Sequence, residues 1–198
     1  MNETRPPRLR PILLLSLGLA LAACTGSEEP PLKGAAIGGP FTLTNQDGRK
    51  VTERDFAGKY RIMYFGFTHC PDVCPTDLAV IGQALRRFEE SDPARAARVA
   101  PIFVSVDPER DSPAVLKDYV AAFHPRLVGL TGTPEQVAET VKRYGAYGAK
   151  EAPGSGGGYN VNHSRVAELI GPDGEPIALL PYEKGAEAVA AELERWVR

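Results

Sequence analysis

The chain has 198 residues, of which 43% are apolar and 24% are charged. These values are ordinary for a soluble globular protein, and the length suffices for one domain with a full core. The formal net charge of -2 argues against a nucleic-acid partner, because nucleic-acid binding usually relies on a basic surface.

The first 23 residues have the composition of a bacterial lipoprotein signal peptide. Arg5, Arg8 and Arg10 precede the apolar run 12–23, and small residues lead into Cys24. The run is 12 residues long, shorter than the roughly 20 residues that a membrane-spanning helix needs. We therefore expect cleavage before Cys24 and lipidation of that cysteine, with an uncleaved anchor helix as the alternative.

Residues 24–39 are rich in proline, glycine and glutamate, which is typical of a flexible tether. A lipid on Cys24 would then hold the remaining residues, 40–198, as a folded domain at a membrane. We expect an extracytoplasmic, membrane-anchored lipoprotein that faces the periplasm or the cell exterior. Thr25 is not the Asp that commonly retains lipoproteins on the inner membrane, so the choice of membrane stays open.

The remaining chain alternates between apolar runs and amphipathic segments. The turn signal 45–48 predicts a hairpin of strands 41–44 and 50–52. Further strands are predicted at 61–67, 99–106, 127–130, 163–170 and 175–180, and helices at 74–90, 113–123, 134–144 and 183–197. Residues 145–162, which include the glycine-rich run 154–158, are predicted to be a long loop. This order predicts an α/β sheet with helices on both faces.

Cys70 and Cys74 lie where a buried strand is followed by a helix, the position at which open α/β sheets expose reactive groups. We expect Cys74 near the helix N-terminus, where the helix dipole favours a thiolate. The Cys-x-x-x-Cys spacing suits metal chelation and dithiol chemistry, and an inert disulfide is the third possibility.

A third ligand must come from elsewhere in the chain, and three histidines are available. The side chain of His69 is expected to diverge from the cysteine pocket, and His124 is explained by its place after a helix. His163 follows the glycine-bearing loop, so it can swing over the cysteines. Two thiolates and one imidazole suit a single copper ion, as Cu(I), Cu(II) or both, with zinc as the competitor.

Four segments in order make the chain similar to the SCO/SenC family of copper chaperones for cytochrome c oxidase. They are FGFTHCPDVCPTDL (65–78), VSVDPERDSP (104–113), LTGTPEQV (130–137) and YNVNHS (159–164). The resemblance spans residues 39–197 and implies a thioredoxin-like fold with an N-terminal β-hairpin and additional inserted hairpin elements. It also implies a copper site of Cys70, Cys74 and His163. Asp107 would lie nearby, where it would orient His163 or tune the oxidation state of the copper, or instead cap the turn before the next helix.

The family's usual pattern after His163 is interrupted by Arg165, Glu168 and Gly171. The alternation there still predicts a half-exposed strand, so we expect the departures to alter the surface that meets a partner.

The function implied by the resemblance is that of a metallochaperone rather than an enzyme. It would deliver copper to the dinuclear copper centre of the copper-bearing subunit of cytochrome c oxidase, and a second periplasmic copper chaperone is a further expected partner. The alternative is a thiol–disulfide oxidoreductase that reduces the subunit's cysteines through Cys70 and Cys74. A peroxide-reducing enzyme is the third possibility. It would need a low-pKa cysteine with a threonine and an arginine nearby, and Thr68 supplies only part of that set.

Overall fold

The structure is a computed structural model, and it describes Met1 and residues 28–152 and 158–198. The predicted signal peptide, Cys24, the first residues of the tether and most of the glycine run therefore lie outside the described residues. None of the described helices combines the length and the apolar character that crossing a bilayer requires.

A seven-stranded sheet forms the centre of the domain, in the order β2-β1-β5-β4-β3-β8-β9. The three middle strands β5, β4 and β3 are parallel, and the other pairings are antiparallel. The strands are β1 (Thr42–Asn45), β2 (Lys50–Thr52), β3 (Tyr60–Gly66), β4 (Val99–Ser105), β5 (Val128–Thr131), β8 (Ala167–Ile170) and β9 (Pro176–Leu179). The prediction of an α/β sheet and of an N-terminal hairpin is confirmed.

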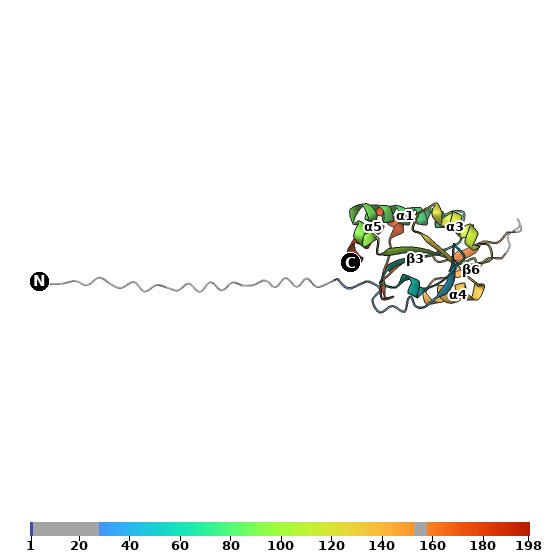
Figure 1. Cartoon of the computed structure of the whole chain (residues 1–198), viewed down its shortest axis with the longest axis horizontal. Helices are drawn as coiled ribbons and strands as arrows, with labels where there is room; N and C mark the ends of the chain where they lie inside the picture. The colour runs from blue at the N-terminus through green and yellow to red at the C-terminus, as the bar shows by residue number, and fades with distance from the viewer. Residues whose placement is uncertain (2–27, 153–157) are drawn as a thin grey trace.

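Helices cover both faces of the sheet. Helices α1 (Val73–Ser91), α3 (Pro113–Ala121) and α5 (Ala186–Trp196) lie over one face, and α4 (Pro134–Arg143) lies over the other (Figure 1). The short α2 (Pro93–Ala96) follows α1. Proline in the first turn begins α3 and α4, and at α4 Thr133 and Gln136 form the predicted capping box.

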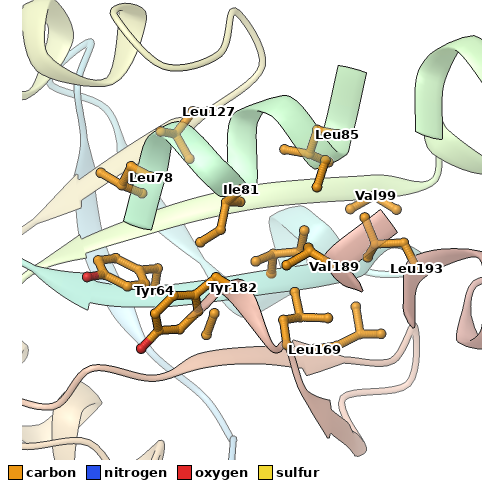
Figure 2. Packing of buried hydrophobic residues seen from close by; sticks show 14 of the residues in the cluster. Tyr64, Leu78, Ile81, Leu85, Val99, Leu127, Leu169, Tyr182, Val189 and Leu193 are labelled. Carbon is orange, nitrogen blue, oxygen red and sulfur yellow. The ribbon is translucent and has the colours of Figure 1, made fainter. Parts of the chain in front are cut away.

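The core under α1 and α5 is the larger of two apolar clusters. Leu78, Ile81, Leu85 and Phe88 recur at helical spacing on α1 and are fully buried. They belong to one buried cluster with Leu169 of β8 and with residues of α5 such as Val189 and Leu193. Figure 2 shows Leu78, Ile81 and Leu85 of α1 near these residues. Each such side chain stabilises the fold by roughly 1.5–3 kcal/mol when buried, so this contact holds the strand-to-helix junction after β3 in place.

The second apolar cluster lies under α4 and includes Phe41, Phe65 and Tyr144. Part of the predicted tether packs beside it. The Leu32 amide donates to the carbonyl of Ile177 at 3.0 Å, the Gly38 amide donates to the carbonyl of Arg143 at 3.0 Å, and Ile37 packs against the cluster. The described part of residues 24–39 therefore lies against the domain.

Two predicted elements differ from the structure. Residues 145–162 are not one loop, because β6 (Gly148–Lys150) and β7 (Val161–His163) pair as a separate antiparallel hairpin. The strand predicted from His163 to Ile170 is divided between β7 and β8. The prediction that it is half-exposed is wrong for β8, whose four residues are all buried, because β3 and β9 flank it and both faces are covered.

Candidate metal centre

The two cysteines lie at the carboxyl end of β3, in the connection to α1. The Cys70 amide donates to the carbonyl of Phe67 at 3.2 Å, which closes a turn directly after the strand. Cys74 is the second residue of α1, two residues after the N-cap residue Asp72. Cys70 is partly exposed, whereas Cys74 is fully buried, and both are free thiols. The Cys74 amide points at the Cys70 sulfur, 3.5 Å away.

His163 completes a three-residue group with these cysteines. Its Nε2 lies 3.3 Å from the Sγ of Cys74, although 89 positions separate the two residues in the chain. One ligand atom each from Cys70, Cys74 and His163 lies within 4.8 Å of the others. No other group of three or more potential ligands among the described residues is compact enough to hold one metal ion.

The orientation of the imidazole is set by the backbone next to it. The Nδ1 of His163 lies 2.8 Å from the carbonyl oxygen of Ser164. Since a carbonyl only accepts hydrogen bonds, Nδ1 is the donor in this contact, and Nε2 is the ring nitrogen that faces the sulfurs. The ring also packs edge-on against Phe67, with centroids 5.5 Å apart and an interplanar angle of 82°. The ring is therefore held with Nε2 directed at the cysteine sulfurs.

The surroundings of Cys74 do not favour a thiolate in the metal-free protein. Burial raises the pKa of the Cys74 thiol to about 12, and the nearby sulfur of Cys70 adds to the effect, while a hydrogen bond with the Phe67 backbone lowers it. The prediction that Cys74 favours the thiolate is wrong for the metal-free protein, because burial is the largest influence on its pKa and raises it. Metal binding at this site would therefore release the thiol proton.

Space for the Cys74 sulfur is provided by Gly66, the last residue of β3. A Cβ atom at Gly66 would lie 2.7 Å from the Cys74 Sγ, 3.1 Å from the Phe103 ring and 3.2 Å from the Tyr64 ring. Contacts this short with a sulfur and two packed rings require the neighbours to move. Glycine is therefore needed here for close packing rather than for an unusual backbone angle.

We expect Gly66→Ala to lower the free energy of unfolding by about 1–3 kcal/mol, the usual cost of overpacking a core. The displaced sulfur should also weaken metal binding by at least about tenfold, the lower end of what changes around a metal ligand cost. Chemical denaturation and a metal titration measure the two effects. Gly158→Ala is the control, since a Cβ atom there meets nothing within 4 Å. Equal affinity of Gly66→Ala and the wild type would contradict the argument.

Asp111 holds the cysteine loop and was not predicted as a site residue. Its carboxylate is fully buried, accepts a hydrogen bond from the Thr68 hydroxyl at 2.6 Å and another from the Ser105 hydroxyl at 2.6 Å, and also accepts from the Thr68 amide. The sequence did contain a signal, because Asp111 follows β4, and parallel neighbouring strands end at the same sheet edge. Because its hydroxyl donates to Asp111, Thr68 has a structural role in holding the cysteine loop.

Asp107 lies near the group but does not contact His163 in any described hydrogen bond. Its backbone carbonyl accepts from the amides of Arg110 and Asp111, which closes the turn after β4. Its buried carboxylate accepts from the Tyr159 hydroxyl at 2.8 Å and from the Nε of Arg110. The Asp107 backbone therefore caps the turn, as the second alternative predicted. The Ser164 carbonyl, rather than Asp107, orients the imidazole.

The other two histidines lie outside the three-residue group. His69 is half-exposed, and its Nδ1 lies 3.1 Å from the Thr68 hydroxyl. His124 follows α3 and is buried, with its Nε2 3.4 Å from a carboxylate oxygen of Glu89. Burial lowers the pKa of His124, and the Glu89 carboxylate opposes the shift. His69 is outside the ligand group, as expected, and His124 follows a helix, as expected.

A strand, a Cys-x-x-x-Cys turn and a helix, with a distant histidine carried over the sulfurs, define a thioredoxin-like protein with a soft metal site. The fold is confirmed by the thioredoxin domain of a thiol–disulfide oxidoreductase from Bacteroides vulgatus. That domain aligns with a TM-score of 0.56 at 17% identity and covers 84% of this chain and 98% of the domain.

The particular family follows from closer relatives. The SCO1/SenC family model matches residues 29–198, and the chain belongs to this family. It is 44% identical over 146 residues to the mitochondrial protein SCO1 homolog 1 of Arabidopsis thaliana, covering 74% of this chain. The chain spans 42% of the length of that relative. The copper-bound structure of Bradyrhizobium japonicum ScoI aligns with a TM-score of 0.73 at 42% identity, covering 81% of this chain and 99% of ScoI.

Proposed function

We propose that the chain binds one copper ion through Cys70, Cys74 and His163 and carries it as cargo. The single observation that supports this most strongly is the approach of the His163 Nε2 to within 3.3 Å of the Cys74 sulfur. Thiolates and an imidazole are the donors that copper prefers, and Cu(I) accepts a low coordination number. Structural zinc sites usually have four protein ligands, whereas three protein ligands are grouped here within the described residues.

The proposed role is delivery of copper to the copper-bearing subunit of cytochrome c oxidase during its assembly. Family membership supports the role, since the Sco family is one of cytochrome c oxidase assembly proteins. The site is suited to transfer because Cys70 is partly exposed, so its sulfur is accessible to a partner. A second periplasmic copper chaperone is the proposed source of the ion.

The alternative role is reduction of the subunit's cysteines by thiol–disulfide exchange. Two free cysteines in a thioredoxin-like fold favour it. The raised pKa of Cys74 disfavours that residue as the attacking thiol, because exchange proceeds through a thiolate. The same raised pKa argues against Cys74 as a peroxide-reducing cysteine, which needs a low pKa.

A transfer experiment tests the first role against the second. The full chain, reduced and loaded with one equivalent of Cu(I), is mixed with the metal-free soluble domain of the oxidase subunit, and copper is measured on each partner after separation. We expect the wild type and His69→Ala to transfer copper equally, because His69 lies outside the ligand group. His163→Ala should hold and transfer little copper.

The same proteins are then mixed with the oxidised subunit domain, and the release of its thiols is followed. Thiol exchange needs the cysteines but not the imidazole, so exchange should persist in His163→Ala if it occurs at all. If the wild type transfers no copper and both the wild type and His163→Ala carry out thiol exchange, copper delivery is refuted and the oxidoreductase role is favoured.

We also propose that a lipid on Cys24 anchors the chain to a membrane outside the cytoplasm. The proposal rests on the basic, apolar and small-residue order of residues 1–24. Cell fractionation and labelling with a fatty acid test it. The wild type should sediment with membranes and carry the label, whereas Cys24→Ala should not carry the label. Incorporation of labelled fatty acid into Cys24→Ala would contradict the anchor site.

A further inference from the structure

His163 reaches the cysteines on a hairpin that packs against the core through Val161 but forms a sheet separate from the seven-stranded one. Among the described residues, strands β6 and β7 pair with each other and with no other strand, in the register Gly148 with His163, Ala149 with Asn162 and Lys150 with Val161. Two-stranded hairpins are marginally stable by themselves. Something outside the hairpin must therefore hold His163 at its observed distance from the sulfurs.

Arg110, in the turn after β4, makes such a contact with Tyr159, which lies two residues before β7. The Arg110 guanidinium carbon is 3.9 Å from the centroid of the Tyr159 ring, and Nη1 donates to the Tyr159 carbonyl at 3.0 Å. The same guanidinium lies 5.7 Å from the ring of Phe67, which packs edge-on against His163. A cation over an aromatic face is attracted to the ring, and more strongly when the pair is shielded from water.

The carboxylate of Asp107 completes the contact between Arg110 and Tyr159. This carboxylate is fully buried and accepts from both the Tyr159 hydroxyl, at 2.8 Å, and the Arg110 side chain. The Arg110 side chain is only 24% exposed, so this cluster is largely shielded. Lys150 adds a second cation, 4.9 Å from the Tyr159 ring centroid.

We infer that Arg110 is a positioning residue for His163. By holding Tyr159 against Asp107, it ties the hairpin to the rigid end of β4 and sets how readily the imidazole leaves a bound ion. This inference rests on the proposed function for its copper readouts but not for its effect on the hairpin. Asp107 and Tyr159 act in the same way, by holding the hairpin that carries His163, while the Ser164 carbonyl orients the imidazole ring.

The test compares three variants of the full chain. Arg110→Met keeps the length of the side chain but removes its charge and hydrogen bonds, and Tyr159→Phe removes only the hydroxyl. The matched control is Arg98→Met, which removes a cation 5.5 Å from the Tyr60 ring, outside the cluster around Tyr159. Each protein is loaded with one equivalent of Cu(II), and nitrogen hyperfine coupling and the rate of copper loss to a chelator are measured.

We expect Arg110→Met to lose copper about tenfold faster and to show altered nitrogen coupling, in line with the 10–100-fold cost of outer partners at metal sites. Tyr159→Phe should show a smaller change of the same sign, and Arg98→Met none. A lower melting temperature of Arg110→Met with unchanged coupling and release rate would overturn the inference, since a purely structural residue would behave in that way. If Arg110→Met does not fold, Tyr159→Phe decides the question by the same two copper readouts.

A metal-free measurement separates failure of this inference from failure of the proposed function. Amide hydrogen exchange in β7 should be faster in Arg110→Met and unchanged in Arg98→Met, whether or not copper binds. Unchanged exchange in β7 of Arg110→Met would overturn the inference. Absence of copper binding by the wild type would instead overturn the proposed function.

Discussion

Replacing any one of the three grouped residues is expected to remove most of the affinity for copper. For Cys70→Ser and Cys74→Ser, a hydroxyl replaces a soft thiolate, and for His163→Ala the imidazole grouped with the two sulfurs is lost. Changing an outer partner of a metal site already costs 10–100-fold in affinity, so we expect losses above about 100-fold for these ligands. Competition with a chromophoric Cu(I) chelator measures them.

The design of this experiment has to exclude other thiols and loss of folding. All variants should carry Cys24→Ser, because Cys24 is the third cysteine of the chain. His69→Ala is the matched control, since it removes an imidazole beside Cys70 that lies outside the group. Thermal unfolding of the metal-free proteins shows that each variant is folded. Unchanged affinity in His163→Ala would leave a two-sulfur site and refute the three-ligand arrangement.

Glu168 is expected to make the domain less stable as the pH rises. It lies on β8 opposite Met63 of β3, it is 2% exposed, and its Oε2 has no hydrogen-bond partner among the described residues. Burial raises the pKa of the Glu168 carboxyl from its ordinary value of 4.5 to about 8. The folded protein therefore keeps this proton over a pH range in which the unfolded chain has lost it.

The sign of the effect follows from proton counting. Between pH 4.5 and about 8 the folded state binds one more proton at Glu168 than the unfolded state, so the free energy of unfolding falls as the pH rises. At about 1.4 kcal/mol for each pH unit, the loss by pH 7 is roughly 3 kcal/mol. Glu168→Gln removes the ionisable group and should be more stable than the wild type at pH 8.

Chemical denaturation at pH 5, 6, 7 and 8 checks this prediction. The difference in unfolding free energy between Glu168→Gln and the wild type should grow with pH, and taking the difference cancels other groups such as His124. Glu90→Gln is the control, because Glu90 is exposed on α1. A difference that stays constant across this range would show that Glu168 titrates normally.

The glycine-bearing segment shows why local patterns were insufficient for one part of the fold. Strands β6 and β7 have three residues each, too few to show a clear period of two, and Gly148 has a low propensity for strands. Glycine is nevertheless suited to this position, since a Cβ atom there would lie 2.8 Å from Val106. The hairpin is stabilised by packing against the end of β4, which sequence periodicity does not report.

The network under Cys74 was also out of reach of sequence reasoning. Asp77 is buried on α1 and accepts from the Tyr64 hydroxyl at 2.9 Å and from Arg165 at 2.9 Å. Arg165 had been assigned to a surface that meets partners, yet it forms an ion pair with this buried carboxylate while remaining half-exposed. Its partner lies 88 positions away, so only the folded chain brings the two together.

The sequence by itself determined the order of the main strands and helices, the junction that carries Cys70 and Cys74, and the family. These features are local, because hydrophobic period, proline and capping residues act within a few positions. The tertiary structure decided which nitrogen of His163 faces the sulfurs, how strongly Cys74 holds its proton and that Glu168 is buried. Each of these depends on desolvation or on contacts between distant segments, and both arise only when the sheet, the helices and the β6–β7 hairpin are assembled.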